Sequence, residues 1–541
     1  MTYTPAVDAL AGSLPLTALA AAVPIVVFFL LVGVLQLRSH VSGAFALAAA
    51  LIVAVAAFKM PVQMALSGML LGFTFGLLPI GLIVLAAVWL HNLMTATGRE
   101  RDLTAIFDRV SRGDIRVETL LIALCFGGLL EGLAGFGVPV AILTVLLINL
   151  GLEPHKAAII ALVANTSPVA YAAFGVPITT AGSLLGGADK SANAAEIAVQ
   201  VSTLEPWIAL VMPFVLLWLI DRHSFGQLFV LAAGMGVSEA AGQFLTIRYV
   251  SFELAGVLPA IVTFGVAMGL LALHHPQPPT EYARARHAHL HPGRSAMAIL
   301  PYALVIAILA GGRMIPPLRD TLAATDLHIT WPGLEGLTGP GGADAAATHV
   351  ILPTLSQPGV LIAIAAVISA VVFSLADAGG RYPLGARAVA GAAVETWHKM
   401  RLAVLTIVEV IGLAYVMNLS GEVLAIGTLL AATGGAFVFL SPVIGWLGTA
   451  ISGSATSANA LFTGLQDATA IQVGMSGTYA VALNTAGGVI GKLVAPQSLA
   501  IGAAAMGEPE KETWLLRRVL GVSILLLVYI IAVGALVNLL H

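Results

Sequence analysis

The segments NTSPVAYAAFGVP at 165–177 and NTAGGVIGKLVAP at 484–496 both begin with Asn-Thr and end with Pro twelve positions later. About thirty residues before each Asn lies a Gly-rich segment, LAGFGVP at 133–139 in the first copy and ISGSATS at 451–457 in the second. All four segments lie in apolar sequence. Paired Gly- and Pro-interrupted segments in corresponding halves of a membrane protein indicate the substrate site of a secondary transporter.

The composition of the chain is that of a membrane protein. Apolar residues make up 59% and charged residues 9% of the 541 residues, whereas soluble domains carry about 45–50% and about 25%. Runs such as LTALAAAVPIVVFFLLVGVLQ at 16–36 reach the roughly 20 residues that cross the hydrocarbon core. We predict an all-α polytopic protein with about 12–14 transmembrane or half-spanning segments. The single cysteine, Cys125, excludes intramolecular disulfides.

Lysine and arginine set the orientation, because cytoplasmic loops are enriched in them. Four basic regions are placed on the cytoplasmic side: 99–116, 274–294, 377–401 and 511–518. Two acidic segments are placed outside: 189–205 and 313–357. The first copy then runs from inside to outside and the second from outside to inside. The two copies are therefore predicted to form an inverted-topology repeat.

This arrangement predicts five parts of the chain. Helices precede, separate and follow the two repeat cores, each of which contains a hairpin and a broken helix. The parts are N-terminal helices at 1–115, the first core at 116–205, intervening helices with two cytoplasmic loops at 206–420, the second core at 421–507, and a C-terminal helix at 508–541.

Each core is expected to hold a re-entrant hairpin, at 127–150 and at 441–464, with its tip near the midplane. A helix broken by glycine or proline exposes backbone N–H groups, and these donors together with the helix dipole favour an anion. Each Asn-Thr pair is expected to mark the break in the following helix. Asn, Ser and Thr supply amide and hydroxyl groups. This set of groups suits a small carboxylate that bears a hydroxyl, and we expect both tips and both Asn-Thr pairs to converge on one site.

The competing interpretation is that these small residues serve close helix packing. A lone GxG favours that interpretation, whereas SGSATSAN at 452–459 gathers five polar side chains in an apolar stretch and favours a ligand site. The candidate substrate-binding residues are Gly135, Phe136, Gly137, Asn165, Thr166, Ser167, Ser454, Thr456, Ser457, Asn459, Asn484, Thr485 and Gln497.

The chain resembles the bacterial lactate permease family in four long motifs. They are FGGLLEGLAGFGVPVAI at 126–142, NTSPVAYAAFGVPI at 165–178, GSATSANALF at 453–462 and NTAGGVIGKLVAPQSLAIG at 484–502. The resemblance covers nearly the whole chain. It implies a transporter of the bacterial inner (plasma) membrane that imports lactate, and often glycolate, with a proton, and that shares inverted repeats and hairpin tips with the ion transporter superfamily. The family commonly has Asp in the second hairpin motif, where this chain has Ala455.

Ionisable residues in apolar sequence are candidates for proton coupling. Glu131 precedes the first tip, matches the family motif and is the first choice, with a hydrogen-bonded packing role as the alternative. Lys492 either supplies positive charge for the carboxylate or extends to the membrane interface. Glu239 and Glu409 either replace the missing Asp or form buried structural contacts.

Other classes of function compete with proton symport. A sodium-coupled carboxylate transporter of the same architecture stays open, because carbonyl and hydroxyl oxygens at hairpin tips also hold Na⁺. No HExxH or GxSxG motif supports an enzyme. The His-rich tract in the loop at 274–294 lacks regular ligand spacing, so neither a metal nor a cofactor is predicted. The expected partners are a short 2-hydroxy monocarboxylate such as L-lactate, D-lactate or glycolate, a proton and membrane lipids, without nucleic acid.

Overall fold

Helices form almost all of the regular structure in this computed structural model, which describes residues 2–135, 137–274, 276–283, 292–338, 349–375 and 384–540. Phe136, parts of the loops at 274–294 and 377–401, and several histidines of the His-rich tract lie outside these ranges. Within them, ten helical segments are long and apolar enough to cross a membrane. One further pair of helices, bent by 63° at a short break, is together long and apolar enough to form a broken span. Two shorter apolar helices accompany them. The polytopic helical class is therefore confirmed.

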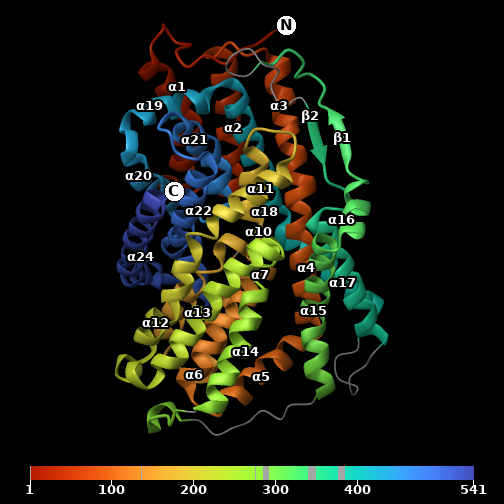
Figure 1. The fold of residues 1–541 in the computed structure, drawn as a ribbon, viewed down its shortest axis with the longest axis vertical. Coiled ribbons are helices and arrows are strands. Elements are labelled where there is room, and N and C mark those ends of the chain that lie inside the picture. The colour runs from red at the N-terminus through yellow and green to blue at the C-terminus, as the bar shows by residue number, and fades with distance from the viewer. Residues whose placement is uncertain are drawn as a thin grey trace.

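The N-terminal helices run from the top of the molecule to its bottom, and the C-terminal helix lies at the left (Figure 1). They are α1 (Leu14–Phe29), α2 (Ser39–Ala56), α3 (Val62–Phe75), α4 (Leu82–Ala96), α5 (Arg99–Ser111) and α24 (Glu512–Leu540). Large apolar side chains such as Leu19, Ile52 and Leu525 are exposed on them. In water such a surface marks an interaction site, whereas in a bilayer it faces lipid, since the helices satisfy their own backbone groups.

The first repeat core crosses the molecule from one end to the other. Its helices are α6 (Ile115–Leu120), α7 (Gly127–Leu133), α8 (Val138–Leu150), α9 (Pro154–Ala164), α10 (Ala172–Leu184) and α11 (Lys190–Val201). In Figure 1 α6 lies at the bottom, α7 and α10 lie in the middle and α11 lies nearer the top.

The second core starts near the opposite end. Its helices are α19 (Glu422–Leu430), α20 (Phe437–Ser452), α21 (Ala455–Gln472), α22 (Gly477–Gly491) and α23 (Pro496–Ala505). Thr478 at the start of α22 donates to Glu196 of α11 at 3.2 Å, whereas Glu508, just after α23, lies 3.2 Å from His155 near the start of α9. The two segments therefore run in opposite directions, which agrees with the predicted inversion, whereas the division of the chain into five parts stays a prediction. That their hairpins re-enter the membrane stays a prediction.

Intervening elements join the two cores. They are α12 (Glu205–Asp221), α13 (Phe225–Tyr249), α14 (Leu258–Leu273), α15 (Pro292–Met314), α16 (Pro316–Ala323), β1 (Leu327–Thr330), β2 (His349–Leu352), α17 (Pro358–Leu375) and α18 (Ala386–Ser420). Strands β1 and β2 pair antiparallel, with Leu327 opposite Leu352. This small sheet lies in the acidic segment 313–357, at the upper right of Figure 1, and is an addition that hydropathy did not predict. Helices α12 and α13 form a hairpin whose open end is joined by Arg248 and Ser202 at 3.2 Å.

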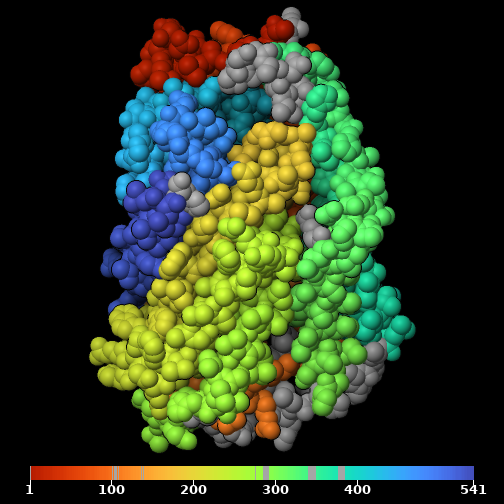
Figure 2. Space-filling view, in the orientation of Figure 1, coloured from red at the N-terminus to blue at the C-terminus, as the bar shows by residue number. Residues whose placement is uncertain are grey.

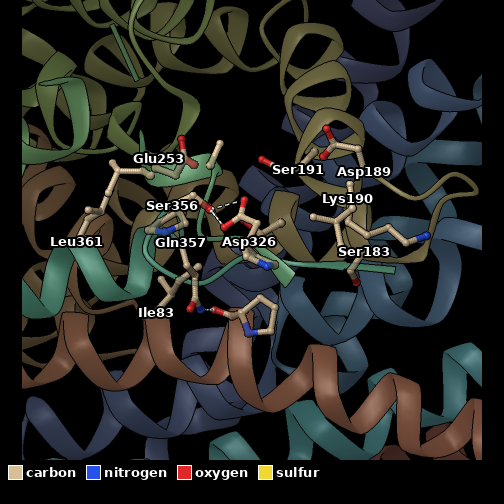
Figure 3. Close-up of a pocket in the computed structure, with 18 of the residues that line it drawn as sticks. Ile83, Ser183, Asp189, Lys190, Ser191, Glu253, Asp326, Ser356, Gln357 and Leu361 are labelled. Carbon is tan, nitrogen blue, oxygen red and sulfur yellow. Dashed lines mark hydrogen bonds between the residues drawn. The ribbon is translucent and has the colours of Figure 1, made fainter. Parts of the chain in front are cut away.

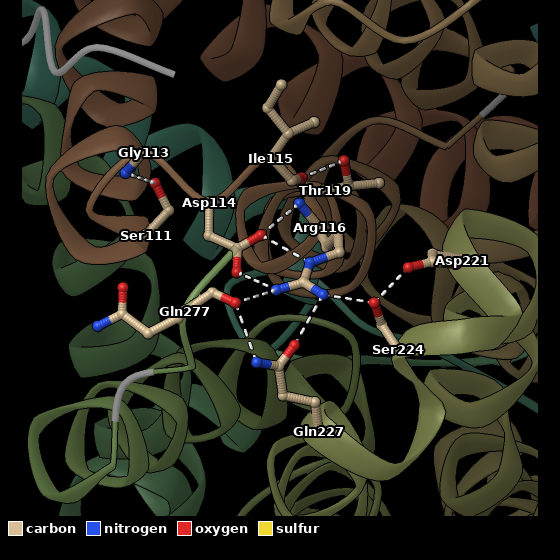
Figure 4. Close-up of polar contacts among 10 residues, drawn as sticks. All are labelled: Ser111, Gly113, Asp114, Ile115, Arg116, Thr119, Asp221, Ser224, Gln227 and Gln277. Carbon is tan, nitrogen blue, oxygen red and sulfur yellow. Dashed lines mark hydrogen bonds and ion pairs between the residues drawn. The ribbon is translucent and has the colours of Figure 1, made fainter. Parts of the chain in front are cut away.

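A buried polar cluster holds the bottom end of the bundle together (Figure 4). The Arg116 guanidinium is fully buried and pairs with Asp114 at 2.8 Å. It also donates to the Ser224 hydroxyl, to Gln227 at 2.9 Å and to the Gln277 carbonyl at 3.4 Å. These partners come from the start of α6, the α12–α13 turn and the segment after α14. The cluster therefore joins three parts of the chain at the end that the basic loops assign to the cytoplasm.

Arg116→Ala is expected to destabilise the protein strongly, because Asp114 would keep a buried charge without its partner. Breaking a buried ion pair from one side costs about 3–5 kcal/mol. Lys399→Ala is the control: Lys399 and Glu395 form an exposed pair at 2.6 Å, and such pairs contribute about 0.2–1 kcal/mol. Thermal unfolding of the two variants in detergent should separate them clearly. Equal melting temperatures would contradict a structural role for the Arg116 cluster.

Candidate functional site

The first hairpin tip lies against an unwound stretch of the following helix. Gly135 and Gly137, between α7 and α8, have φ of +56° and +83°. A Cβ placed on Gly135 would lie 3.3 Å from the Cβ of Ala172. Immediately after that contact, Ala173 and Phe174 have φ of 45° and 57°. Non-glycine residues adopt this left-handed conformation at a cost of roughly 1–2 kcal/mol each, and such strain clusters at functional sites.

The second tip is formed by the turn between α20 and α21. Gly453 has φ of +75°, and the Ser454 hydroxyl accepts a hydrogen bond from the Ser457 N–H at 3.1 Å, which caps α21. Because Ser454 occupies only one donor, other N–H groups of the first turn of α21 have no partner within the helix. The chain therefore forms a helix, a turn and a second helix at 441–464, with an anion-favouring N-terminus at the turn. That this hairpin re-enters the membrane stays a prediction.

The break in the second copy lies eight residues later than predicted. Asn484 and Thr485 lie inside the continuous helix α22, and the chain leaves the α-helix at the 3-10 turn Lys492–Val494 before α23 begins at Pro496. The prediction that this Asn-Thr pair marks the break was wrong. Close packing explains the continuity: a Cβ on Gly445 of α20 would lie 1.8 Å from the Asn484 carbonyl oxygen. In the first copy, by contrast, Asn165 directly follows the end of α9.

These segments enclose a cavity of about 40 Å³. At roughly 10–15 Å³ for each water-sized group, this volume is on the scale of a very small carboxylate. The first copy contributes residues of the unwound helix, namely Val169, Ala172, Ala173, Val176 and Pro177. The second copy contributes its tip and its break, namely Gly453, Ser454, Ala455, Thr456, Lys492 and Gln497. The structure thus brings the second tip and both helix breaks together, with the first tip packed behind Ala172.

An ion pair links the two copies beside this cavity. The Lys492 ammonium lies 3.8 Å from a carboxylate oxygen of Glu131. Glu131 is fully buried, and Lys492 is 8% exposed. The distance is longer than a hydrogen bond, and neither Glu131 oxygen has a hydrogen-bond partner among the described residues. Lys492 lines the cavity and Glu131 does not, so Lys492 contacts both the buried carboxylate and the space for a ligand.

Side chains of the second copy form a hydrogen-bonded network centred on Asn459. The Asn459 amide donates to the Pro177 carbonyl at 3.0 Å and to Thr485 at 3.1 Å, and its oxygen accepts from Asn484 at 3.0 Å. Gln466 donates to the Asn484 side-chain oxygen at 3.0 Å. This network joins the second hairpin to α22 and to the first copy, so its primary effect is to fix the shape of the site.

The polar groups of the first copy lack such partners. Within the described residues the Asn165 oxygen and the hydroxyls of Ser167 and Tyr171 are buried without a hydrogen bond. Asn165 also faces the Glu131 carboxylate. Buried polar atoms are nearly always hydrogen-bonded in native proteins. The Glu131 carboxylate and the facing Asn165 oxygen therefore mark a place where a proton, water or ligand is accommodated.

Comparison with known proteins gives a single family. The family model described as L-lactate permease matches residues 17–541. The chain belongs to the L-lactate permease family. It is 35% identical to the L-lactate permease of Bacillus subtilis, with 98% of this chain and 97% of that protein aligned. It is 36% identical to the glycolate permease GlcA of Escherichia coli and 32% identical to the L-lactate permease of that organism, each with 94% of this chain and 93% of the relative aligned.

A solved structure, that of the Alcanivorax borkumensis YdaH transporter, aligns with 86% of each chain at a TM-score of 0.42 and 16% identity. Family membership and the membrane helices confirm that this permease is a multi-pass membrane transporter and not an enzyme. They are consistent with the bacterial inner membrane.

Two carboxylates proposed from the sequence lie outside the cavity of this permease. Glu239 on α13 accepts a hydrogen bond from Thr263 of α14 at 2.8 Å. Glu409 on α18 lies against α2, where a Cβ on Gly43 would meet its carboxylate oxygen at 2.9 Å. Neither residue lines the cavity. Ser457 and Thr166 are buried beside the second tip and after α9 without lining it, and Phe136 lies outside the described residues.

Sequence reasoning missed two residues that the structure places at the site. Gln466 completes the Asn459–Asn484 network, and Tyr171 lies buried at the start of the unwound helix. Gln466 follows Asn459 by seven residues on α21, so both share one helix face. The sequence signal for Gln466 was therefore a second polar residue on the Asn459 face of an apolar helix. Ala455 lines the cavity that Lys492 also lines.

Proposed function

We propose that this permease imports L-lactate, and with it D-lactate and glycolate, together with a proton across the bacterial inner membrane. The names of the relatives support short 2-hydroxy monocarboxylates as the substrate class. The repeat cores at 116–205 and 421–507 would form the transport site, flanked by the helices at 1–115, 206–420 and 508–541. The observation that carries proton coupling is the buried Glu131–Lys492 pair beside the cavity.

The substrate carboxylate would bind to positive charge that the chain already places at the cavity. Lys492 supplies a full charge, and the N-terminus of α21 supplies backbone N–H groups and a partial charge of about +0.5. The Thr456 hydroxyl and the Gln497 amide line the same cavity and can bond the 2-hydroxyl. A carboxylate and an adjacent hydroxyl would thus be bound by different groups of the second copy.

Charge balance would couple this anion to a proton. A buried charge requires a partner, and Lys492 has Glu131 as its partner when the cavity is empty. Lactate that pairs with Lys492 leaves the Glu131 carboxylate buried without its counter-charge. Protonation of Glu131 removes that charge. The loaded site then contains Lys492, lactate and a neutral Glu131, and the empty site contains the ion pair, so both are electrically balanced.

Uptake of labelled lactate into proteoliposomes tests this function and separates it from sodium coupling. With the purified protein, a pH gradient (acid outside) imposed without sodium is expected to drive accumulation. A sodium gradient at equal pH is expected to drive none. Protein-free liposomes control for diffusion of lactic acid. Accumulation that requires sodium and ignores the pH gradient would reject proton symport.

A further inference from the structure

A second and larger cavity, of about 360 Å³, lies on the side of α10 toward the predicted outer surface. Its walls include α10–α11 and the segment from α16 to α17, as Figure 3 shows: Ser183, Asp189 and Ser191 lie on one side, and Asp326, Ser356 and Gln357 lie on the other. Figure 2 shows the yellow α11 region beside the green segment that carries β1. Both acidic segments assigned to the outside, 189–205 and 313–357, contribute to this lining.

One face of α10 connects this cavity to the substrate cavity. Val176 lines the small cavity, and Thr179 and Ser183 line the large one. These residues follow one another at spacings of three and four, so they form a single stripe along the helix. Seven residues of helix rise about 10 Å. The two cavities therefore lie in series along one wall, with Ser183 nearer the outside and Val176 at the substrate site.

The aromatic ring of Phe252 lies at the junction. A Cβ on Gly175 would lie 2.9 Å from the Cδ2 atom of Phe252, and the ring also lines the large cavity. Phe252 belongs to the connector between α13, with 25 residues, and α14, with 16 residues. The connector is buried at Phe252, Leu254 and Ala255. Gly256 packs against the backbone of Tyr171, since a Cβ there would lie 3.3 Å from the Tyr171 carbonyl oxygen.

We propose that the large cavity is the outer vestibule through which the substrate anion reaches the site, and that Phe252 is the gate between them. The inference rests on the proposed function for the identity of the anion, a short carboxylate. The buried Arg116 cluster lies at the opposite end of the molecule, which the basic loops assign to the cytoplasm. The left-handed turn at 173–175 places Gly175 against the Phe252 ring. Displacement of the ring would connect the large cavity with the substrate cavity along this face of α10.

Cysteine accessibility tests the vestibule without relying on transport. Cys125 is the sole cysteine and is buried, so Cys125→Ser gives a background on which Thr179→Cys and Thr180→Cys are compared. Thr179 lines the vestibule, whereas its neighbour Thr180 is fully buried. A membrane-impermeant charged methanethiosulfonate should modify Thr179→Cys about tenfold faster than Thr180→Cys in right-side-out vesicles, since thiol reactivity follows exposure. Equal rates, or faster modification of Thr179→Cys in inside-out vesicles, would reject the vestibule.

Saturating lactate provides the separate readout of substrate identity. Protection of Thr179→Cys by lactate supports a vestibule for this anion. Fast outside modification that lactate leaves unchanged would keep the access route and reject lactate as the molecule that passes through it. One experiment therefore distinguishes a failure of the vestibule proposal from a failure of lactate as the substrate.

Val176→Cys tests the gate, because Val176 lies at the substrate cavity beyond Phe252. Its modification from outside is expected to be slow on the Cys125→Ser background and about tenfold faster when Phe252→Ala is added. Thr179→Cys, which lies above the ring, should change little with Phe252→Ala. Phe252→Leu shortens the side chain while keeping it apolar and repeats the test should the alanine variant not fold. An unchanged Val176→Cys rate in a folded Phe252 variant would reject the gate.

Discussion

Glu131→Gln is expected to abolish accumulation of lactate while leaving exchange of lactate for lactate intact. The amide is neutral and has the shape of the protonated acid, so Lys492 is free to bind the anion and the loaded protein reorients normally. The empty protein, however, must return with Lys492 buried and unpaired. An uncompensated buried charge costs about 3–5 kcal/mol, which slows the return roughly a hundredfold to several-thousandfold.

The measurement compares two assays on the same proteoliposomes. Uptake driven by a pH gradient reports the full cycle, and efflux of labelled lactate into unlabelled lactate reports exchange alone. Glu239→Gln and Glu409→Gln serve as controls, because both carboxylates lie outside the cavity. Normal accumulation by Glu131→Gln would show that the proton carrier lies elsewhere, and loss of accumulation in either control would indicate which residue it is.

The sequence was sufficient to predict the membrane helices and two segments of opposite direction, because composition and spacing are strong signals. Membrane-length apolar runs determine helices, and the equal Asn-to-Pro interval with opposite Lys and Arg flanks predicts two cores of opposite direction. A shared site follows from that symmetry. The structure accordingly places Ser454, Thr456, Lys492 and Gln497 around one cavity with the unwound first-copy helix.

The position of each helix break was less predictable, because it depends on packing between segments far apart in sequence. Gly487 of α22 approaches α20 so closely that a Cβ there would lie 1.8 Å from the Pro442 carbonyl oxygen. The glycines after Asn484 therefore serve close helix contact, which was the competing interpretation, and the helix continues. In the first copy, Ala173 and Phe174 adopt left-handed conformations that neither residue favours. No local pattern reveals a conformation imposed by the neighbouring tip.

The Glu131–Lys492 contact was likewise beyond local sequence reasoning. Both residues were candidates separately, but they lie 361 positions apart in a chain of 541 residues. Only the meeting of the first hairpin with the second break brings them together. Their pairing joins two separate candidates into one pair of opposite charges. It also gives a physical reason for the lysine, since backbone N–H groups alone could attract an anion.

Thr456→Val is expected to weaken the binding of lactate more than that of propionate. Asn459→Ala, by contrast, is expected to weaken the binding of both ligands equally. Thr456 lines the cavity, and its replacement by an isosteric valine removes one hydroxyl. A hydrogen bond contributes about 0.5–1.5 kcal/mol, so lactate affinity should fall about two- to tenfold, while propionate, which lacks the 2-hydroxyl, changes little. Ser457→Ala should resemble Asn459→Ala, because Ser457 is buried outside the cavity lining.

Asn459 acts differently because its side chain is committed within the protein. Its hydrogen bonds to Pro177, Thr485 and Asn484 join the second tip to the unwound helix of the first copy. Alanine leaves those buried partners unsatisfied at about 1–3 kcal/mol for each group, and the walls of the cavity lose their common anchor. Competition of lactate and propionate against labelled lactate measures both affinities in one assay. If Asn459→Ala lowered the affinity for lactate and not that for propionate, the Asn459 amide would bind the 2-hydroxyl directly. The hydrogen-bond network would then rearrange when the substrate binds.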